Sequence, residues 1–275
     1  MAHTLDRTLI SVAGEDATAF LHNLLTQNLE GMEDGAVRYA ALLSPQGKVT
    51  TDMFVWRTGA RYLLDAPASR GSDLLRRLML YKLRSRVVIA DANAELVVCW
   101  DESRFSSAQP DPRLADLGWR ALSARRESAG PSGDEGLARH ALSLGVPDLA
   151  RDAAPEEVFA LEALLYELSG VDMNKGCYVG QENVSRMMRR ATTRKKFCPI
   201  EFDGDAPASG TPVQADGVDV GVARRVIPGR AMTLLRLDRA LDALADGVML
   251  TINGAPARLA PPPWLILPQR QAEGD

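Results

Sequence analysis

The sequence contains few cysteines, few aromatic residues and no long apolar run. Its three cysteines, Cys99, Cys177 and Cys198, include no close pair, which excludes a disulfide framework and a CxxC metal or redox site. Aromatic residues make up 5% of the chain, too few for a platform that stacks single-stranded nucleic-acid bases. The longest uncharged run, residues 259–269, is about half as long as a membrane-spanning helix. We therefore predict no membrane-spanning segment and no membrane partner.

Composition and charge are those of an ordinary soluble protein. The 275 residues are 46% hydrophobic and 25% charged, and the length favours one large domain or two to three small ones. The net charge of −4 argues against a chain that binds polyanions over its whole surface. Asp6, Glu15 and Asp16 make the start of the chain unlike a signal peptide or a mitochondrial presequence. We therefore expect a cytoplasmic, bacterial protein.

The first third of the chain alternates strand-like and helix-like patterns. Apolar residues spaced three and four apart predict an amphipathic helix after Asp16, and a second helix is expected after Pro67. β-Runs are expected at residues 8–12, 37–43, 48–57, 62–64 and 86–90. The turn Ser44 to Gly47 should join the two longest runs into a hairpin. The order β-α-β-β-α-β is that of a ferredoxin-like antiparallel sheet.

The rest of the chain predicts helices followed by a β-rich end. A short helix is expected from Leu137 to Leu144, and a longer one from Pro155 to Gly170, with acidic residues in its first turn. After residue 196 the sequence changes to short β-runs, and Asn253-Gly254 indicates a hairpin. We predict an α+β protein in which residues 1–196 form sheets with helices and residues 197–275 form a small β-barrel.

The most unusual segment is Asn174 to Arg186, which contains two glycines and one cysteine. Gly176 would let a partner approach the backbone closely, and the cation of Lys175 would favour the thiolate of Cys177. Two interpretations stay open. Cys177 is either a reactive thiol or a small buried apolar residue, since free cysteine is among the most buried residue types.

A cysteine nucleophile would also need a histidine base. The chain offers only His3, His22 and His140. His3 lies near the terminus and His22 within the first predicted helix, so His140 is the best of three poor candidates. No spacing of histidines and cysteines is typical of a metal site, and we expect none.

Six cations lie within residues 186–196 of a chain whose net charge is negative. They are Arg186, Arg189, Arg190, Arg194, Lys195 and Lys196. Such a run can neutralise phosphates or several carboxylates, and the alternative is a solvated helix face.

The predicted strand Val49 to Trp56 carries one carboxylate among apolar residues. Alternation places Asp52 on the same face as Phe54 and Trp56. A carboxylate is costly to bury without a hydrogen-bond partner or a function. Asp52 is therefore either a functional acid or an exposed residue at the rim of the sheet.

The segment Lys175-Gly-Cys-Tyr-Val-Gly-Gln-Glu182, followed by Val184-Ser-Arg186, resembles the K-G-C-Y-x-G-Q-E signature of YgfZ-type folate-binding proteins. These are relatives of the glycine-cleavage aminomethyltransferase, the T-protein, and include mitochondrial iron–sulfur assembly factors. Further similar segments are Leu24 to Leu29, Gly47-Lys-Val, Leu144 to Pro147, and Gly221 with Ala231 to Asp238. The likeness thus covers nearly the whole chain. It departs at Ala141, where family members usually carry arginine.

This resemblance implies a GcvT-like three-part fold around a central folate pocket. It implies binding of tetrahydrofolate or a one-carbon derivative, and a role in the assembly or repair of iron–sulfur clusters that affects tRNA-modifying cluster enzymes. Its partners would be folate and iron–sulfur client or assembly proteins. The basic run would contact the glutamate tail of folate, tRNA or a protein.

The resemblance also assigns candidate residues. Cys177 would be the functional thiol, and Asp52 would be an acid facing the one-carbon unit, so both are candidate catalytic residues. The candidate folate-binding residues are Asp52, Glu162, Lys175, Gly176, Tyr178, Gln181, Glu182 and Arg186. Two other functions stay open: a folate-dependent aminomethyltransferase, and a non-enzymatic adaptor that binds RNA or protein through the basic run. Whether the chain is an enzyme is left undecided.

Overall fold

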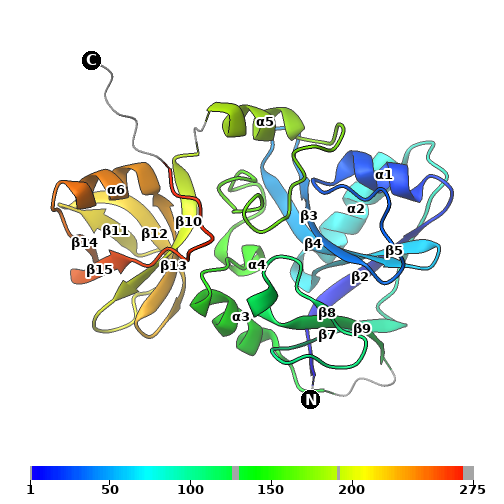
Figure 1. Cartoon of the computed structure of the whole chain (residues 1–275), viewed down its shortest axis with the longest axis horizontal. Helices are drawn as coiled ribbons and strands as arrows, with labels where there is room; N and C mark the ends of the chain where they lie inside the picture. Colours follow the sequence, from blue (N-terminus) through cyan, green and yellow to red (C-terminus); the bar gives the residue numbers. More distant parts are fainter. Residues whose placement is uncertain (1, 126–129, 191–192, 269–275) are drawn as a thin grey trace.

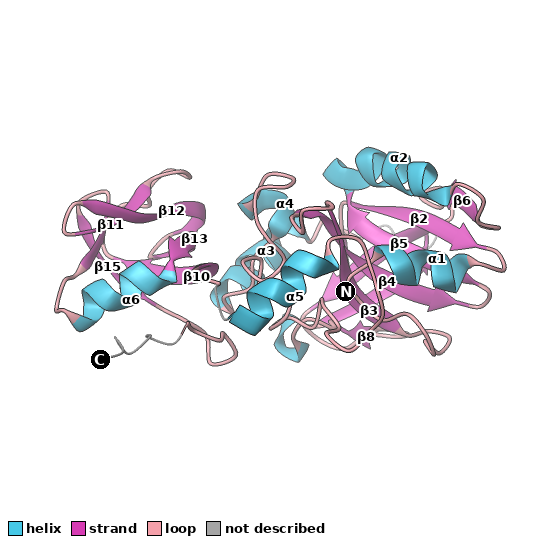
Figure 2. Ribbon diagram, turned by 90° about the horizontal axis from the view of Figure 1, so that it is seen from above, coloured by secondary structure: helices cyan, strands magenta, loops and turns pink. Residues whose placement is uncertain are grey.

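The computed structural model describes residues 2–125, 130–190 and 193–268, and its N-terminal part is built on a five-stranded antiparallel sheet (Figures 1 and 2). The strands are β2 Arg7–Ala13, β3 Val37–Leu43, β4 Val49–Thr58, β5 Arg61–Pro67 and β6 Val88–Asp91, in the order β3-β4-β5-β2-β6. The predicted hairpin is present as β3 and β4. The sheet has one strand more than the ferredoxin-like order, because β5 extends the hairpin into a meander.

The two faces of this sheet have different covers. Helices α1 Ala17–Leu24 and α2 Gly71–Lys82 pack on one face, against Met53 and Val55 of β4, and the short helix η1 Ala68–Arg70 precedes α2. The alternate residues Phe54 and Trp56 point to the other face and join a second core. The predicted two-residue period of β4 is therefore confirmed.

A four-stranded sheet covers that second face. Its strands are β1 His3–Thr4, β7 Leu96–Asp101, β8 Gln109–Pro110 and β9 Trp119–Ala124, in the order β1-β7-β9-β8, and the short helix η2 Ala115–Leu117 precedes β9. Trp100 of β7 shares a hydrophobic core with Phe54 and Trp56. The two sheets therefore enclose one interior between them.

The predicted helix from Pro155 to Gly170 is wrong. After α3 Asp134–Ser143 and α4 Leu149–Asp152, residues 155–169 form successive turns whose N–H groups bond three, four or five residues back. Glu156, Leu164 and Ser169 have positive φ angles, which a regular helix excludes. The apolar residues of this stretch are buried on more than one side: Val158, Ala160, Leu161, Ala163, Leu164, Leu165 and Leu168. An apolar spacing of three and four does not require a helix when the whole segment is enclosed.

Helix α5 Gln181–Arg190 leads to a closed six-stranded antiparallel barrel. Its strands are β10 Lys195–Phe202, β11 Pro212–Ala215, β12 Val218–Ile227, β13 Arg230–Arg236, β14 Leu250–Ile252 and β15 Ala255–Leu259. Helix α6 Leu237–Ala245 follows β13. The predicted barrel is confirmed, and the division at residue 196 stays a prediction. No helix in the described parts of the chain is long and apolar enough to cross a membrane.

Candidate functional site

The signature loop, residues 174–180, is anchored at one end by Lys175. The buried ammonium of Lys175 donates hydrogen bonds to the carbonyl oxygens of His22, Leu25 and Gln27, at 2.5, 2.7 and 2.9 Å. These carbonyls lie at the end of α1, where the helix leaves acceptors unsatisfied and its dipole favours a cation. Burial lowers the pKa of Lys175 to about 8. All three ammonium hydrogens are thus used within the chain, which leaves none for the Cys177 thiolate or for folate.

The other end of the loop packs on the turn between β3 and β4. Gly180 has a φ of +82°, and a Cβ atom there would lie 2.6 Å from the carbonyl oxygen of Ser44. Gly47 has a φ of +83°, and its own Cβ would meet Asn183 at 2.9 Å. The Asn183 side chain donates to the carbonyl of Gln46 at 2.9 Å. Two segments far apart in sequence, both predicted to matter, are therefore held side by side.

Between these anchors the loop exposes a thiol. Cys177 is exposed, whereas Cys99 and Cys198 are buried. The interpretation of Cys177 as a buried apolar residue is thereby excluded. A Cβ on Gly176 would have its nearest neighbour, His22 Nε2, at 3.9 Å, so the fold itself does not require glycine there. Open backbone and an accessible thiol therefore adjoin each other.

The histidine nearest this loop is His22 and not His140. The His22 side chain is buried, and its Nδ1 accepts the N–H of Leu29 at 3.4 Å. Burial, followed by the nearby Lys175 cation, lowers the pKa of His22. His140 instead lies against the second sheet, where its Nε2 contacts the carbonyl of Asp116 at 2.7 Å. Helical spacing gave no sign that the loop would return to the end of α1.

The remaining signature residues divide between core and surface. Tyr178 is buried, with the Lys175 ammonium 5.1 Å from its ring centroid, and burial raises its pKa to about 12. Gln181 donates its backbone N–H to the Tyr178 carbonyl at the start of α5. Glu182 and Arg186 are exposed on α5, and Arg186 donates to the Asn183 side chain at 2.7 Å. Tyr178 thus supports the loop, while Glu182 and Arg186 face solvent.

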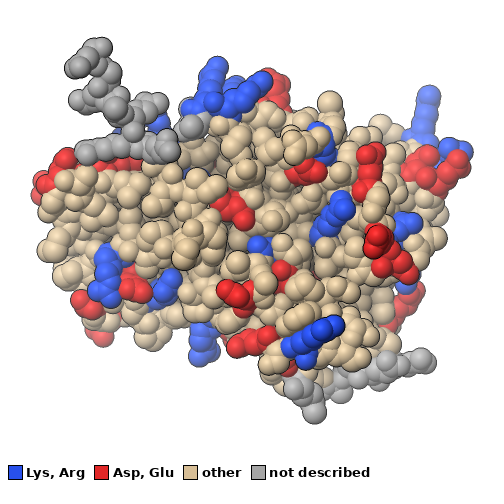
Figure 3. Space-filling view, in the orientation of Figure 1, with Lys and Arg blue, Asp and Glu red and all other residues tan. Residues whose placement is uncertain are grey.

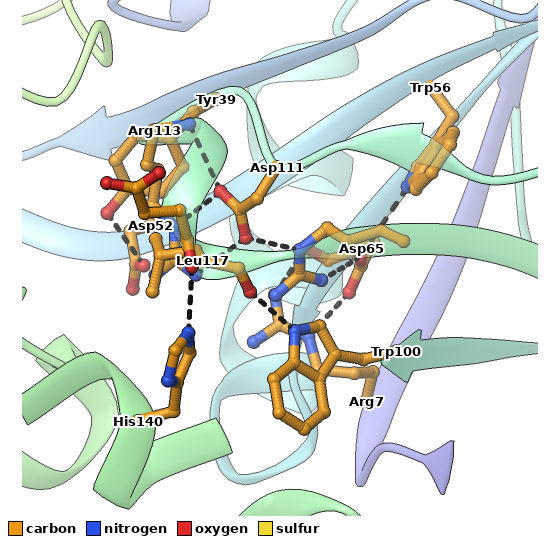
Figure 4. Close-up of polar contacts among 12 residues, drawn as sticks. Arg7, Tyr39, Asp52, Trp56, Asp65, Trp100, Asp111, Arg113, Leu117 and His140 are labelled. Carbon is orange, nitrogen blue, oxygen red and sulfur yellow. Dashed lines mark hydrogen bonds and ion pairs between the residues drawn. The ribbon is translucent and has the colours of Figure 1, made fainter. Parts of the chain in front are cut away.

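Asp52 is buried, so the alternative of an exposed rim residue is wrong. Its Oδ2 accepts the hydroxyl of Tyr39 at 2.9 Å (Figure 4). Burial raises the pKa of Asp52, and the nearby cations Arg7 and Arg113 oppose that rise. Because its pKa is raised, this carboxyl group keeps its proton to a higher pH than an exposed carboxyl group does.

A buried network of charges lies beside Asp52 and joins the two sheets (Figure 4). Asp65 of β5 pairs with Arg7 at 2.5 Å and with Arg120 at 3.4 Å. Asp111 pairs with Arg120 at 2.8 Å and with Arg113 at 2.9 Å. Three guanidinium groups and two carboxylates leave one positive charge, which an ionised Asp52 balances. No sequence pattern pointed to this network.

Asp52 also lines a small cleft between β4 and the segment that follows α4. Its cavity volume is about 10 Å³, room for about one water molecule, and its lining includes Thr50, Arg70 and Ala153. Pockets for drug-sized ligands measure roughly 300–1,000 Å³. The Asp52 carboxyl and the Arg70 guanidinium suit the polar edge of a folate in their chemistry, but the cavity as it stands is too small to enclose a ring of that molecule. Neither Glu162 nor any signature residue is among the lining.

Glu162 lies in the turns of residues 155–169 and not on the predicted helix. Its Oε2 accepts the N–H of Phe159 at 2.9 Å. Burial raises the pKa of Glu162, and the cations of Lys195 and Lys48 oppose that rise. The structure therefore separates three sets of candidates: the thiol on the signature loop, Asp52 at the cleft, and Glu162 among the turns.

The basic run is partly a surface stripe and partly internal. Arg186, Arg189 and Arg190 are exposed on α5, where Figure 3 shows blue side chains gathered. Val184, on the other side of the helix, is buried. Lys196 is buried and pairs with Glu167, so its predicted contact with an external polyanion is wrong. Lys196 begins a run of five buried residues in β10, Lys196 to Ile200.

The fold defines a protein of the GcvT-like class. It is similar to the crystal structure of glycine cleavage system aminomethyltransferase T from Bartonella henselae, with a TM-score of 0.72 and 16% identity over 96% of this chain and 86% of that chain. The family model for the GCVT N-terminal domain matches residues 6–99, and the model for the CAF17 C-terminal beta-barrel domain matches residues 194–266. The predicted fold class is confirmed.

Sequence comparison identifies a narrower family. The mitochondrial iron–sulfur cluster assembly factor IBA57 of Homo sapiens is 31% identical over 257 residues, which cover 79% of this chain and 72% of that protein. The Mus musculus protein is 31% identical over 74% of this chain and 66% of its own length. The Mycosarcoma maydis homologue is 29% identical over 81% of this chain and 61% of its own length. The chain belongs to the IBA57 family, and it spans 61% of the Mycosarcoma maydis relative.

These relatives correct the expected location. The IBA57 proteins of Homo sapiens, Mus musculus and Mycosarcoma maydis are all mitochondrial by name. The prediction of a bacterial cytoplasmic protein is therefore wrong. It rested on the acidity of a short stretch at the start of the sequence, which carries less weight than membership of a family.

Proposed function

We propose that this chain is an iron–sulfur cluster assembly factor that presents the Cys177 thiol to a protein carrying or receiving a cluster. The observation that supports this most strongly is an exposed thiol on a loop fixed at both ends, by Lys175 on α1 and by Gly180 on the β3–β4 turn. The family relatives are named as assembly factors. A fixed loop limits the conformational entropy that a thiol loses when it binds a partner.

The cluster is cargo in this proposal. The thiolate form of cysteine is the nucleophile and the metal ligand. Among the described residues, no three His, Cys, Asp or Glu side chains are grouped so that they could hold a metal ion. Cys177 would therefore supply one ligand and a partner protein the others. Effects on tRNA-modifying cluster enzymes would follow from the supply of clusters.

Replacing the thiol tests this proposal. In cells that lack their own IBA57, the wild-type chain should restore the activity of cluster-containing enzymes. The activity restored by Cys177→Ser should be lower by about tenfold or more. The matched control is Ser185→Ala on α5, which should restore activity fully at equal protein level. Equal recovery with Cys177→Ser and the wild-type chain would refute the thiol role.

We further propose that tetrahydrofolate or a one-carbon derivative, the ligand that the YgfZ-type signature implies, binds at the mouth of the Asp52 cleft. Asp52 would accept an N–H of the pterin, and Arg70 would face its polar edge or tail. When bound, the folate would supply a nitrogen that carries a one-carbon unit. Calorimetric titration should give binding to the wild-type chain and at least about tenfold weaker binding to Asp52→Asn. Absence of heat with the wild-type chain would reject folate while leaving the thiol proposal intact.

The exposed stripe of α5 supports a contact with an anionic partner such as tRNA. Arg186, Arg189 and Arg190 are exposed on one helix and lie three and four residues apart. Each phosphate contact makes binding more sensitive to salt. We expect the affinity for tRNA to fall steeply as the salt concentration rises, and to fall less steeply for Arg189→Ala. Undetectable binding at low salt would remove the nucleic-acid form of this contact.

A further inference from the structure

The turn that ends α2 places a leucine where the backbone favours glycine. Leu83 has φ 41° and ψ −111°, close to the angles of the second residue of a type II′ turn, and the N–H of Ser85 bonds to the carbonyl of Lys82 at 2.8 Å across it. The Leu83 residue is 86% exposed. Leucine therefore destabilises this turn through its backbone and gains nothing from burial. Neither the turn nor the core explains a leucine here.

Leu83 is part of a larger apolar surface, which we call the α2 tip. Met79 and Leu80 lie four and three residues before Leu83 and are 52% and 63% exposed. Leu74 and Leu78 hold the helix on the five-stranded sheet from its other side. Helix α2 forms the outermost layer of that part of the molecule (Figure 2). The α2 tip therefore faces outward.

Two cations flank the α2 tip without being neutralised. Lys82 is partly exposed and Arg84 is exposed, and within the described part of the chain neither has a carboxylate at ion-pair distance. The other cations of this stretch do have partners: Arg76 and Arg77 pair with Asp73, and Arg86 pairs with Glu15 and Asp16. The surface around Leu83 is therefore apolar at its centre and positive beside it.

We propose that the α2 tip docks on an anionic lipid bilayer. Exposed leucine and methionine side chains next to lysine and arginine suit the boundary between headgroups and acyl chains. The three exposed side chains of the α2 tip offer about a few hundred Å² of apolar surface at most. Each partner in a stable protein complex buries roughly 800 Å² of its surface. A bilayer needs no such area, because a few inserted side chains and a few cations suffice. Peripheral docking also needs no spanning helix, and the prediction of no membrane partner rested on that criterion alone.

Vesicle flotation of the full chain tests this proposal. The wild-type chain should float with vesicles of phosphatidylcholine mixed with phosphatidylglycerol, and much less with pure phosphatidylcholine or at high salt. Arg84→Ala should weaken binding about fivefold, the effect of one cation near an anionic surface. Leu83→Gly should weaken it about tenfold or more, while the melting temperature stays equal or rises, because glycine suits the turn.

The matched control is Met249→Ala, which truncates a residue that is 67% exposed between α6 and β14. It should leave flotation unchanged. The proposal is overturned if the wild-type chain floats with neither kind of vesicle, or if Leu83→Gly floats as well as the wild-type chain. The first of these results would be expected if the tip instead docked on a protein.

Discussion

The buried charge network makes a strong prediction for Asp111→Asn. Asp111 is fully buried; its Oδ2 accepts from Arg120 and Arg113, and its Oδ1 accepts the Arg113 backbone N–H at 3.1 Å. An asparagine keeps an oxygen acceptor in place of Oδ1. In place of Oδ2 it has an N–H₂ group, a donor that would face the guanidinium donors of Arg113 and Arg120. The uncompensated charge of the three arginines rises by one in the interior. Removing one partner of a buried ion pair costs about 3–5 kcal/mol of unfolding free energy.

Chemical denaturation followed by circular dichroism measures this cost. The guanidinium neighbours hold the pKa of Asp111 well below its usual range, so the carboxylate stabilises the fold above about pH 4 and this contribution is lost as the pH falls further. The gap between variant and wild type should therefore narrow in acid. Glu95→Gln is the control, because its ion pair with Arg61 is exposed and should change stability by less than about 1 kcal/mol. A loss below about 1 kcal/mol in Asp111→Asn would refute the reasoning.

Two further variants test other parts of the structure. Burial raises the pKa of Asp152 from 3.8 to about 6, so its contribution to stability is present in acid and falls by about 3 kcal/mol as the pH rises from about 4 to 6. Asp152→Asn should remove this fall from the unfolding free energy measured by denaturation at each pH. An unchanged fall in the variant would show that Asp152 does not cause it. Gly180→Ala should lower unfolding free energy by about 2 kcal/mol or more, while Gly176→Ala should change it by less than about 0.5 kcal/mol; equal effects would show that Gly180 does not anchor the loop.

Local sequence patterns predicted those elements whose surroundings differ on two sides. Strand β4 separates a helix-covered core from an inter-sheet core, so its alternation was visible and placed Asp52 with Phe54 and Trp56. Residues 155–169 are enclosed on several sides, and there the same kind of pattern predicted a helix that does not form. Periodicity is informative where one face is buried and the other is not.

Contacts between distant segments could not be predicted in this way. Arg7, Asp65 and Arg120 are single charged residues in separate strands, and each is typical of a solvent-facing position until the two sheets are brought together. Lys175 was expected to act on its neighbour Cys177, but its ammonium reaches the end of α1 instead. The signature motif singled out Cys177, which the structure exposes, whereas the anchors of the loop depend on the tertiary fold.

The central claim is that the signature loop presents Cys177 while the fold protects the other two thiols. Burial raises the pKa of Cys198 to about 12, which further suppresses its thiolate. The measurement is the rate of maleimide labelling of each cysteine in the native protein, resolved by peptide mass spectrometry. Cys177 should react at the rate of a free exposed thiol, and Cys99 and Cys198 should react only after denaturation. Protection of Cys177 in the native protein would contradict the account.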